Sequence, residues 1–181
     1  MKREDKFEKY KVTKVSTNKV VCNVYMDAFS IEKVKIQNCS YESKDSINIY
    51  LDFPLISRLA ADVTTGRLFK KIEADQYHKY NVHMGGTAKG PDGKPISRRM
   101  DLGMSGEKIF INMSEGPGKL SDTGAIMPDG QPTTKVSVPM SIDDFRELIL
   151  FTHDCVNAYL AHLVNKLVRE SNEDRKNNVN K

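Results

Sequence analysis

Twice along this sequence, runs with an apolar residue at every second position give way to a run with helical spacing. The first series consists of four alternating segments, at residues 10–15, 19–27, 32–37 and 46–52. Alternation with a period of two is typical of half-buried strands. The connections between these segments are short, which makes neighbouring strands antiparallel. We therefore predict a four-stranded antiparallel sheet at the start of the chain.

After residue 53 the apolar period changes from two to that of a helix. Leu55, Ile56, Leu59 and Val63 recur at three- and four-residue steps, and the pattern resumes at Leu68. A Thr-Thr-Gly sequence at residues 64–66 weakens it in between. We predict a helix over residues 54–74 that packs on the first sheet.

A second series of strands follows, at residues 78–85, 98–105, 108–113 and 133–140. Between the last two lies a stretch rich in glycine and proline, residues 115–132, which has no apolar period. A loop of this length inside a compact domain is usually functional or mobile. The glycines at 85–86 and 116–118 are expected to form turns, because the strand-to-helix context of a phosphate-binding loop is absent.

A long amphipathic helix over residues 141–169 comes directly after the last strand. Ser141 is a good N-cap, and Asp144 gives a weaker version of the capping box. An apolar stripe runs from Phe145 through Leu148 and Leu160 to Leu167 at helical steps. Such a helix needs a surface on which to bury its stripe, and we expect the second sheet to provide it.

These elements predict an α+β fold built from two ββββα repeats, in which each antiparallel sheet is packed by a helix. We place a single domain at residues 9–169, with the first unit at 9–75 and the second at 76–169. The polar residues 170–181 are expected to form a disordered tail. Because antiparallel sheets tolerate solvent on one side, the face opposite each helix is expected to stay open.

Composition limits the class of protein. Apolar and charged contents of 39% and 29% fit a globular protein, and a net charge of +4 permits an anionic partner without requiring one. The three cysteines show no metal or redox spacing and are expected to be free thiols. No apolar run approaches the ~20 residues of a membrane span, and no secretory leader is evident. We therefore expect a cytoplasmic protein without membrane contact.

The residues that alternate onto the open faces are rich in basic, amide and aromatic side chains. Lysine and arginine bind phosphates, rings stack on bases and asparagines bond base edges, which suits a single strand of nucleic acid. Any one of these lysines or tyrosines also fits an ordinary solvated strand face. We expect the binding residues to be Lys11, Tyr25, Lys33, Lys35, Tyr50, Lys79, Arg99, Lys108, Phe110 and Lys135.

The sequence predicts no catalytic, cofactor or metal site. His78 and His83 are placed on opposite strand faces, and His153 and His162 lack an acidic third ligand. The nucleophile elbow, the phosphate loop and zinc spacing are all absent. We therefore do not expect an enzyme.

The order of elements resembles the Whirly-type fold of the plant Whirly proteins and the kinetoplastid mitochondrial RNA-binding proteins. It is also similar to a fused pair of positive-cofactor-four coactivator units and to Pur-type repeats. The resemblance is carried by residues 108–113 (KIFINM) and by residues 133–148 (TTKVSVPMSIDDFREL), where a strand leads into a capped long helix. It implies sequence-tolerant binding of single-stranded DNA or RNA, and assembly into closed oligomers such as tetramers. The lysine-glycine-lysine signature of the plant proteins is absent, so no binding residue is transferred by motif.

Two functions therefore stand side by side, ahead of a third, a small enzyme with its site in residues 115–132, for which the residue types support no particular reaction. The first is a protein that binds single-stranded nucleic acid, with DNA favoured over RNA, in replication, repair or transcription, and that forms a homodimer or homotetramer. The alternative is a structural or oligomerisation protein of a phage or bacterial assembly, in which the open faces are buried between copies.

Overall fold

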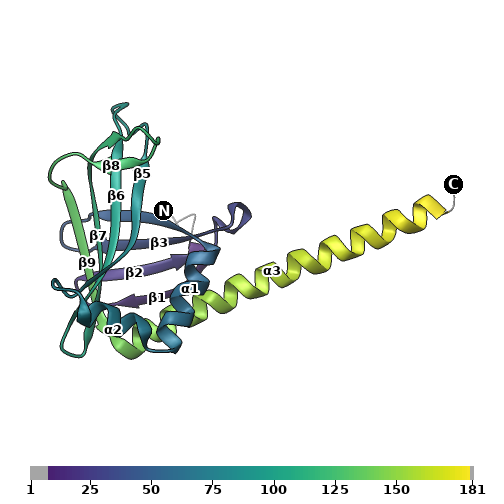
Figure 1. Ribbon diagram of the computed structural model, residues 1–181, viewed down its shortest axis with the longest axis horizontal. Coiled ribbons are helices and arrows are strands. Elements are labelled where there is room, and N and C mark those ends of the chain that lie inside the picture. Colours follow the sequence, from purple (N-terminus) through teal and green to yellow (C-terminus); the bar gives the residue numbers. More distant parts are fainter. Residues whose placement is uncertain (1–7, 180–181) are drawn as a thin grey trace, which may run out of the picture.

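The computed structural model describes residues 8–179. Its elements are η1 (Glu8–Tyr10), β1 (Lys11–Ser16), β2 (Val20–Tyr25), η2 (Phe29–Ile31), β3 (Lys33–Ser40), β4 (Ser46–Asp52), α1 (Phe53–Thr64), α2 (Arg67–Ala74), β5 (Lys79–Thr87), β6 (Ile96–Ser105), β7 (Lys108–Leu120), β8 (Ile126–Pro128), β9 (Thr134–Ser141) and α3 (Ile142–Val179). Figure 1 shows the strands β1–β4 crossing the strands β5–β9, with the three α-helices below and a long part of α3 projecting away.

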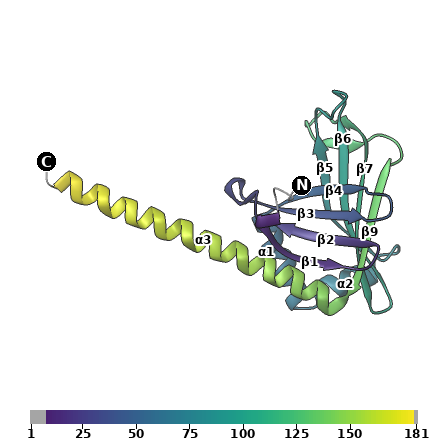
Figure 2. The same ribbon diagram turned by 180° about the vertical axis from the view of Figure 1, so that it is seen from behind.

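The first sheet is an antiparallel meander in the order β1-β2-β3-β4, as the strand pattern predicts. Its inner face carries the apolar set of each strand. Val24, Ile36 and Ile49 lie side by side in the register and are each about 1% exposed. The helix α1, which lies behind this sheet in Figure 2, contacts β3 and β4, and α3 contacts β1.

The second sheet runs β5-β6-β7, and β7 pairs on its other side with β9 along residues 108–115 and with β8 along 118–120. Met100, Leu102, Ile109 and Ile111 form its inner face and are all buried. The alternation of β6, β7 and β9 therefore assigns the inner and outer faces of these strands correctly.

The two sheets pack through their inner faces, with β9 crossing all four strands of the first sheet. Asn38 of β3 is fully buried at this junction, and its Nδ2 donates a hydrogen bond of 2.8 Å to the backbone oxygen of Ile111. A buried amide that bonds a strand of the other sheet fixes how the sheets are placed.

The expected helix at 54–74 is divided into α1 and α2. Gly66 adopts a left-handed conformation with φ 71°, which glycine accepts without steric cost and which ends the first helix. The buried Asp62 of α1 then accepts hydrogen bonds from Arg67 and Lys71 of α2. These bonds fix the angle between the two short helices.

The expected long loop at 115–132 is partly strand. β7 continues to Leu120 and turns back through β8, and the glycines at 85–86 and 116–118 lie inside strands and do not form turns. A Cβ atom at Gly116 would lie 2.7 Å from the Cα of Pro132, and one at Gly118 would lie 2.8 Å from the backbone nitrogen of Ser97. Glycine occupies these positions because neighbouring backbone approaches too closely for a side chain.

The helix α3 begins with the predicted capping box. The Asp144 backbone N–H donates to Ser141 Oγ over 3.0 Å, and the Ser141 N–H donates back to the Asp144 carboxylate over 3.4 Å. The helix then runs to Val179, so residues 170–179 are helical where the composition predicts a disordered tail; residues 180 and 181 lie outside the described part.

Together these elements form a mixed α+β domain with two antiparallel sheets and, within residues 8–179, three α-helices. The predicted repeat has four strands and one helix in each unit. In the structure the first unit has two α-helices, α1 and α2, and the second unit has five strands, β5–β9. Among the described helices none is both long and apolar enough to span a membrane.

Candidate nucleic-acid interface

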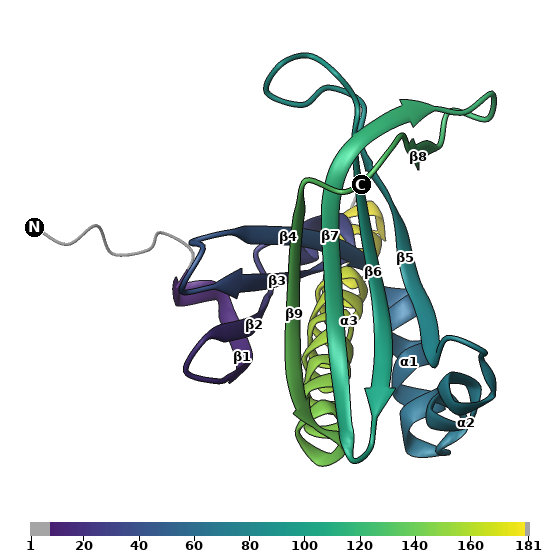
Figure 3. The ribbon, with the colours of Figure 1, turned by 90° about the vertical axis from the view of Figure 1, so that its left-hand side faces the viewer.

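The outer face of the second sheet, formed by β5, β6, β7 and β9, carries five of the ten predicted binding residues. The register of these strands places Lys79, Arg99, Lys108, Phe110 and Lys135 on this face together. Figure 3 looks onto the face, with α3 behind the sheet and no helix in front of it. The three lysines are exposed, and Arg99 and Phe110 are half-buried. We call this surface the second-sheet face.

A row of polar side chains crosses the middle of the second-sheet face. Asn81, Asp101, Asn112 and Ser137 are consecutive partners in the register of the four strands. Asn112 Nδ2 donates to Asp101 over 3.0 Å, and Ser137 Oγ donates to Asn112 Oδ1 over 2.6 Å. Asn81 accepts a hydrogen bond from Arg99. The row therefore holds amides and a carboxylate in fixed positions across the sheet.

Phe110 lies next to this row with small neighbours on both sides. Its register partners are Gly103 on β6 and Pro139 on β9. Because glycine has no side chain and proline a compact one, the flanks of the phenyl ring carry little bulk. An aromatic ring in such a position on a sheet is a suitable platform for stacking a planar group.

The second-sheet face has a surplus of three positive charges, since four basic side chains share it with the single carboxylate of Asp101. Among the described residues, no carboxylate pairs with the ammonium groups of Lys79, Lys108 or Lys135. Arg99 Nε lies 3.8 Å from Asp101, which is 14% exposed. Ammonium groups without a carboxylate partner are available to an anionic ligand.

The other five predicted residues belong to the first sheet, and two of them are not exposed as the alternation predicts. Lys11, Tyr25, Lys35 and Tyr50 form one transverse row on the outer face of β1–β4. However, Tyr25 is only 2% and Lys35 only 6% exposed. The Lys35 ammonium lies 4.4 Å from the centre of the Tyr25 ring and 2.6 Å from Asp27, so both groups are engaged within the protein. Tyr50 is 39% exposed, and Lys11 is half-buried near the Tyr25 ring.

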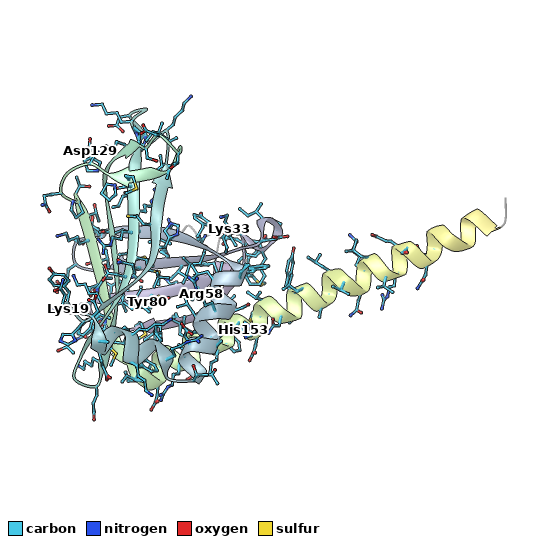
Figure 4. The ribbon with its side chains drawn as sticks, in the orientation of Figure 1. Lys19, Lys33, Arg58, Tyr80, Asp129 and His153 are labelled. Atoms are coloured by element: carbon cyan, nitrogen blue, oxygen red, sulfur yellow. The ribbon has the colours of Figure 1, made fainter. Side chains whose placement is uncertain are left out.

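Lys33 and Tyr50 line a cleft of about 600 Å³ between β4 and the strands β5, β6 and β8. Figure 4 shows Lys33 near the end of the first sheet. Its ammonium pairs with Asp52 over 2.7 Å, and Arg98, on the opposite wall, pairs with Glu115 over 2.5 Å. The cleft thus combines the exposed ring of Tyr50 with two basic side chains, Lys33 and Arg98, whose charges are neutralised by carboxylates.

His83 also lines this cleft, although the strand pattern places it on the outer face. A β-bulge between Asn81 and His83 shifts the register by one residue, so that His83 faces Met100 and Met84 faces Arg99. A shift of one residue moves every following side chain to the other face. Burial lowers the pKa of His83 below its usual value; the Asp52 carboxylate opposes this shift and the Lys33 ammonium reinforces it.

Arg98, Gly103 and Pro139 belong to these two surfaces but were not among the predicted residues. Their contributions depend on which strands pair and in which register, and a single strand pattern does not carry that information. In the described part of the chain, no three His, Cys, Asp or Glu side chains are grouped so that they could hold a metal ion.

Comparison with known proteins gives no family to which the chain can be assigned. No family model matches the sequence, and no curated protein matches it either.

Proposed function

We propose that this protein binds single-stranded nucleic acid on the second-sheet face, without strong sequence preference and with DNA favoured over RNA. One observation carries the proposal: an uncovered four-stranded face combines three lysines without carboxylate partners, a half-exposed phenyl ring and a fixed row of amides. Lysines that follow a phosphate backbone, together with a ring that stacks on bases, are the usual means of sequence-tolerant binding. Replication, repair and transcription all expose such strands.

We also propose that the fold is of the Whirly type. Two crossed antiparallel sheets, each followed in the chain by helices, support this proposal. The additional strand β8 and the division of the first helix by Gly66 are the features specific to this chain. Cys22, Cys39 and Cys155 form no disulfide, which supports a reducing compartment such as the cytoplasm.

Fluorescence polarisation with labelled oligo(dT) and oligo(U) tests the proposed activity. We expect binding at low salt that weakens steeply as salt is added, because phosphate contacts release counterions. Binding that is absent at low salt to both oligonucleotides would refute the proposal and leave the assembly role as the remaining hypothesis. Equal binding to duplex DNA would refute the preference for single strands.

Two sets of variants locate the site. In the test set, Lys79, Arg99 and Lys135 are each changed to Gln, and in the control set Lys44, Arg58 and Lys70 are each changed to Gln. Both sets remove two lysines and one arginine, so the change in net charge is identical. If the test set removes three phosphate contacts, the slope of log K against log salt falls in magnitude by about 2. The control set should leave the slope nearly unchanged.

Phe110→Ala tests the stacking platform. We expect affinity to fall about tenfold, since stacking on an aromatic side chain contributes ~1–3 kcal/mol per base. Tyr41→Ala is the matched control, because this ring is 54% exposed in the connection between β3 and β4. Equal effects of the two substitutions would contradict the assignment of the site to the second sheet.

A further inference from the structure

Apolar side chains of α3 are also found beyond the point where the helix leaves the rest of the protein. Phe145, Ile149 and Val156 are fully buried against the sheets and helices. Tyr159 still packs against the rings of Phe29 and Phe53. The C-terminal part of α3 projects away from the other described elements (Figures 1 and 4). Nevertheless Val164 is 58% and Leu167 is 63% exposed. The projecting half therefore exposes aliphatic side chains of a kind that are normally covered.

These side chains follow a heptad repeat. Leu150, His153, Asn157, Leu160, Val164, Leu167 and Ser171 are spaced alternately by three and four residues. This spacing is that of the a and d positions of a coiled coil, with Leu150 at a and His153 at d. The 21 residues 150–170 make three heptads. Three heptads are the minimum length at which such a pattern indicates a coiled coil, and four of the six a and d positions, Leu150, Leu160, Val164 and Leu167, are aliphatic.

The types of residue at these positions favour two parallel strands. Val164 is β-branched and occupies an a position, and Leu160 and Leu167 occupy d positions, which is the combination typical of parallel dimers. Asn157 occupies another a position, where a single asparagine fixes the register and the number of strands. In the structure of one chain, Asn157 is exposed, and its Nδ2 lies 3.3 Å from Nε2 of the His153 ring.

The flanking positions are complementary to those of an identical chain. In a parallel pair, a g residue lies beside the e residue five positions later in the partner. Leu163 at g would then contact Val168 at e, which is 53% exposed, and add apolar area on both sides of the core. On the outward positions, His162, Asn165, Lys166 and Arg169 are all polar and exposed. The fully buried residues of α3 occupy other positions of the same heptads, so Leu150 and Asn157 are exposed along the body, whereas His153 is half-buried.

We propose that the projecting half of α3 pairs with the same segment of a second copy as a parallel, two-stranded coiled coil. Each dimer would then carry two second-sheet faces. This inference does not depend on nucleic-acid binding, and its tests use no oligonucleotide.

Sedimentation equilibrium of the full chain gives the first test. We expect twice the mass of one chain. A monomer at about 100 µM would overturn the proposal, because the dissociation constant of the dimer would then be well above the micromolar range. A trimer or tetramer would equally overturn the two-stranded arrangement.

Leu167→Asp places a charge in the proposed seam, and Asn165→Asp places the same charge on the outward side two residues away. We expect the dissociation constant to rise by at least about 100-fold for Leu167→Asp and by little for Asn165→Asp, since a charge in an apolar seam is unpaired. Circular dichroism melting checks that the body of Leu167→Asp still folds. A dimer that persists in Leu167→Asp would overturn the proposal.

Ser171→Cys distinguishes parallel from antiparallel pairing. Ser171 is exposed at an a position, so in a parallel pair the two introduced thiols lie opposite one another and form a disulfide under mild oxidation. Asn165→Cys, on the outward side, is the matched control and should not cross-link. Dimers in solution that cross-link no better through Ser171→Cys than through Asn165→Cys would overturn the parallel arrangement.

Discussion

The buried carboxylate of Asp62 gives a prediction that links one residue to the pH dependence of stability. Asp62 has no exposed surface, and its carboxylate accepts hydrogen bonds from Arg67 and from Lys71, the latter over 2.9 Å. Burial alone would raise the pKa of Asp62, but the hydrogen bonds and charges of Lys71 and Arg67 outweigh it and lower the pKa below its usual value. The ionised form is therefore preferred in the folded protein.

Asp62→Asn keeps the shape of the side chain but directs an amide donor at two cationic donors. Two hydrogen bonds to a charged group contribute ~1.5–3 kcal/mol each. Arg67 and Lys71 are 60% and 44% exposed, so solvent screens both bonds and each contributes less than this range, about 1 kcal/mol. We expect a loss of about 2 kcal/mol at pH 7, which corresponds to a fall in Tm of about 4–8 °C for a chain of this size.

The sign of the pH dependence follows from the lowered pKa of Asp62. The group contributes stability at pH values above its unfolded pKa of about 3.9, and this contribution is lost as the pH falls through the folded pKa. Urea unfolding followed by circular dichroism should therefore show a smaller difference between Asp62→Asn and the wild type at pH 3 than at pH 7. Glu107→Gln, on an exposed turn, is the control. A difference that is the same at both pH values, or absent at pH 7, would refute this reasoning.

Other predictions concern packing, the junction of the sheets and the thiols. Leu148→Ala should lose about 2–5 kcal/mol of unfolding free energy, because Leu148 is 1% exposed. Leu120→Ala, at 55% exposure, should lose less than about 1 kcal/mol, and similar losses in urea unfolding would contradict the burial of Leu148. Asn38→Ala should lose about 1–3 kcal/mol of unfolding free energy, since its buried hydrogen bond to Ile111 is removed. An unchanged midpoint of urea unfolding would show that this hydrogen bond does not hold the two sheets together. Burial raises the pKa of Cys22 to about 12, so Cys22 should react with a thiol reagent only after unfolding; rapid reaction in the native state would contradict its burial.

The faces of most strands follow from their sequence because the side-chain period of a strand is fixed. Ile109, Ile111 and Met113 alternate and are buried together, and Phe110 lies opposite them on the second-sheet face. Exposure is a different property. Tyr25 has the predicted outer face but is 2% exposed, because what covers a face depends on contacts from distant parts of the chain.

Three elements differ from the pattern for identifiable reasons. The bulge before His83 arises from pairing with β6, and no residue type near it signals the shift. Residues 116–118 are predicted to form a turn because they are glycine and proline. In the structure they lie inside a strand, and glycine is needed at 116 and 118 because neighbouring backbone atoms leave no room for a side chain. Residues 170–179 lack an apolar stripe, yet each added helical residue gains a backbone hydrogen bond once the helix is nucleated.

The most direct measurement of the proposed binding face is the change in backbone amide chemical shifts when oligo(dT) is added at low salt. We predict the largest shifts at Asn81, Arg99, Phe110, Asn112 and Lys135, on the outer side of β5–β9, and little change along β1–β3. Chemical-shift changes confined to the first sheet, or an unchanged spectrum at saturating oligonucleotide, would contradict binding on the second-sheet face.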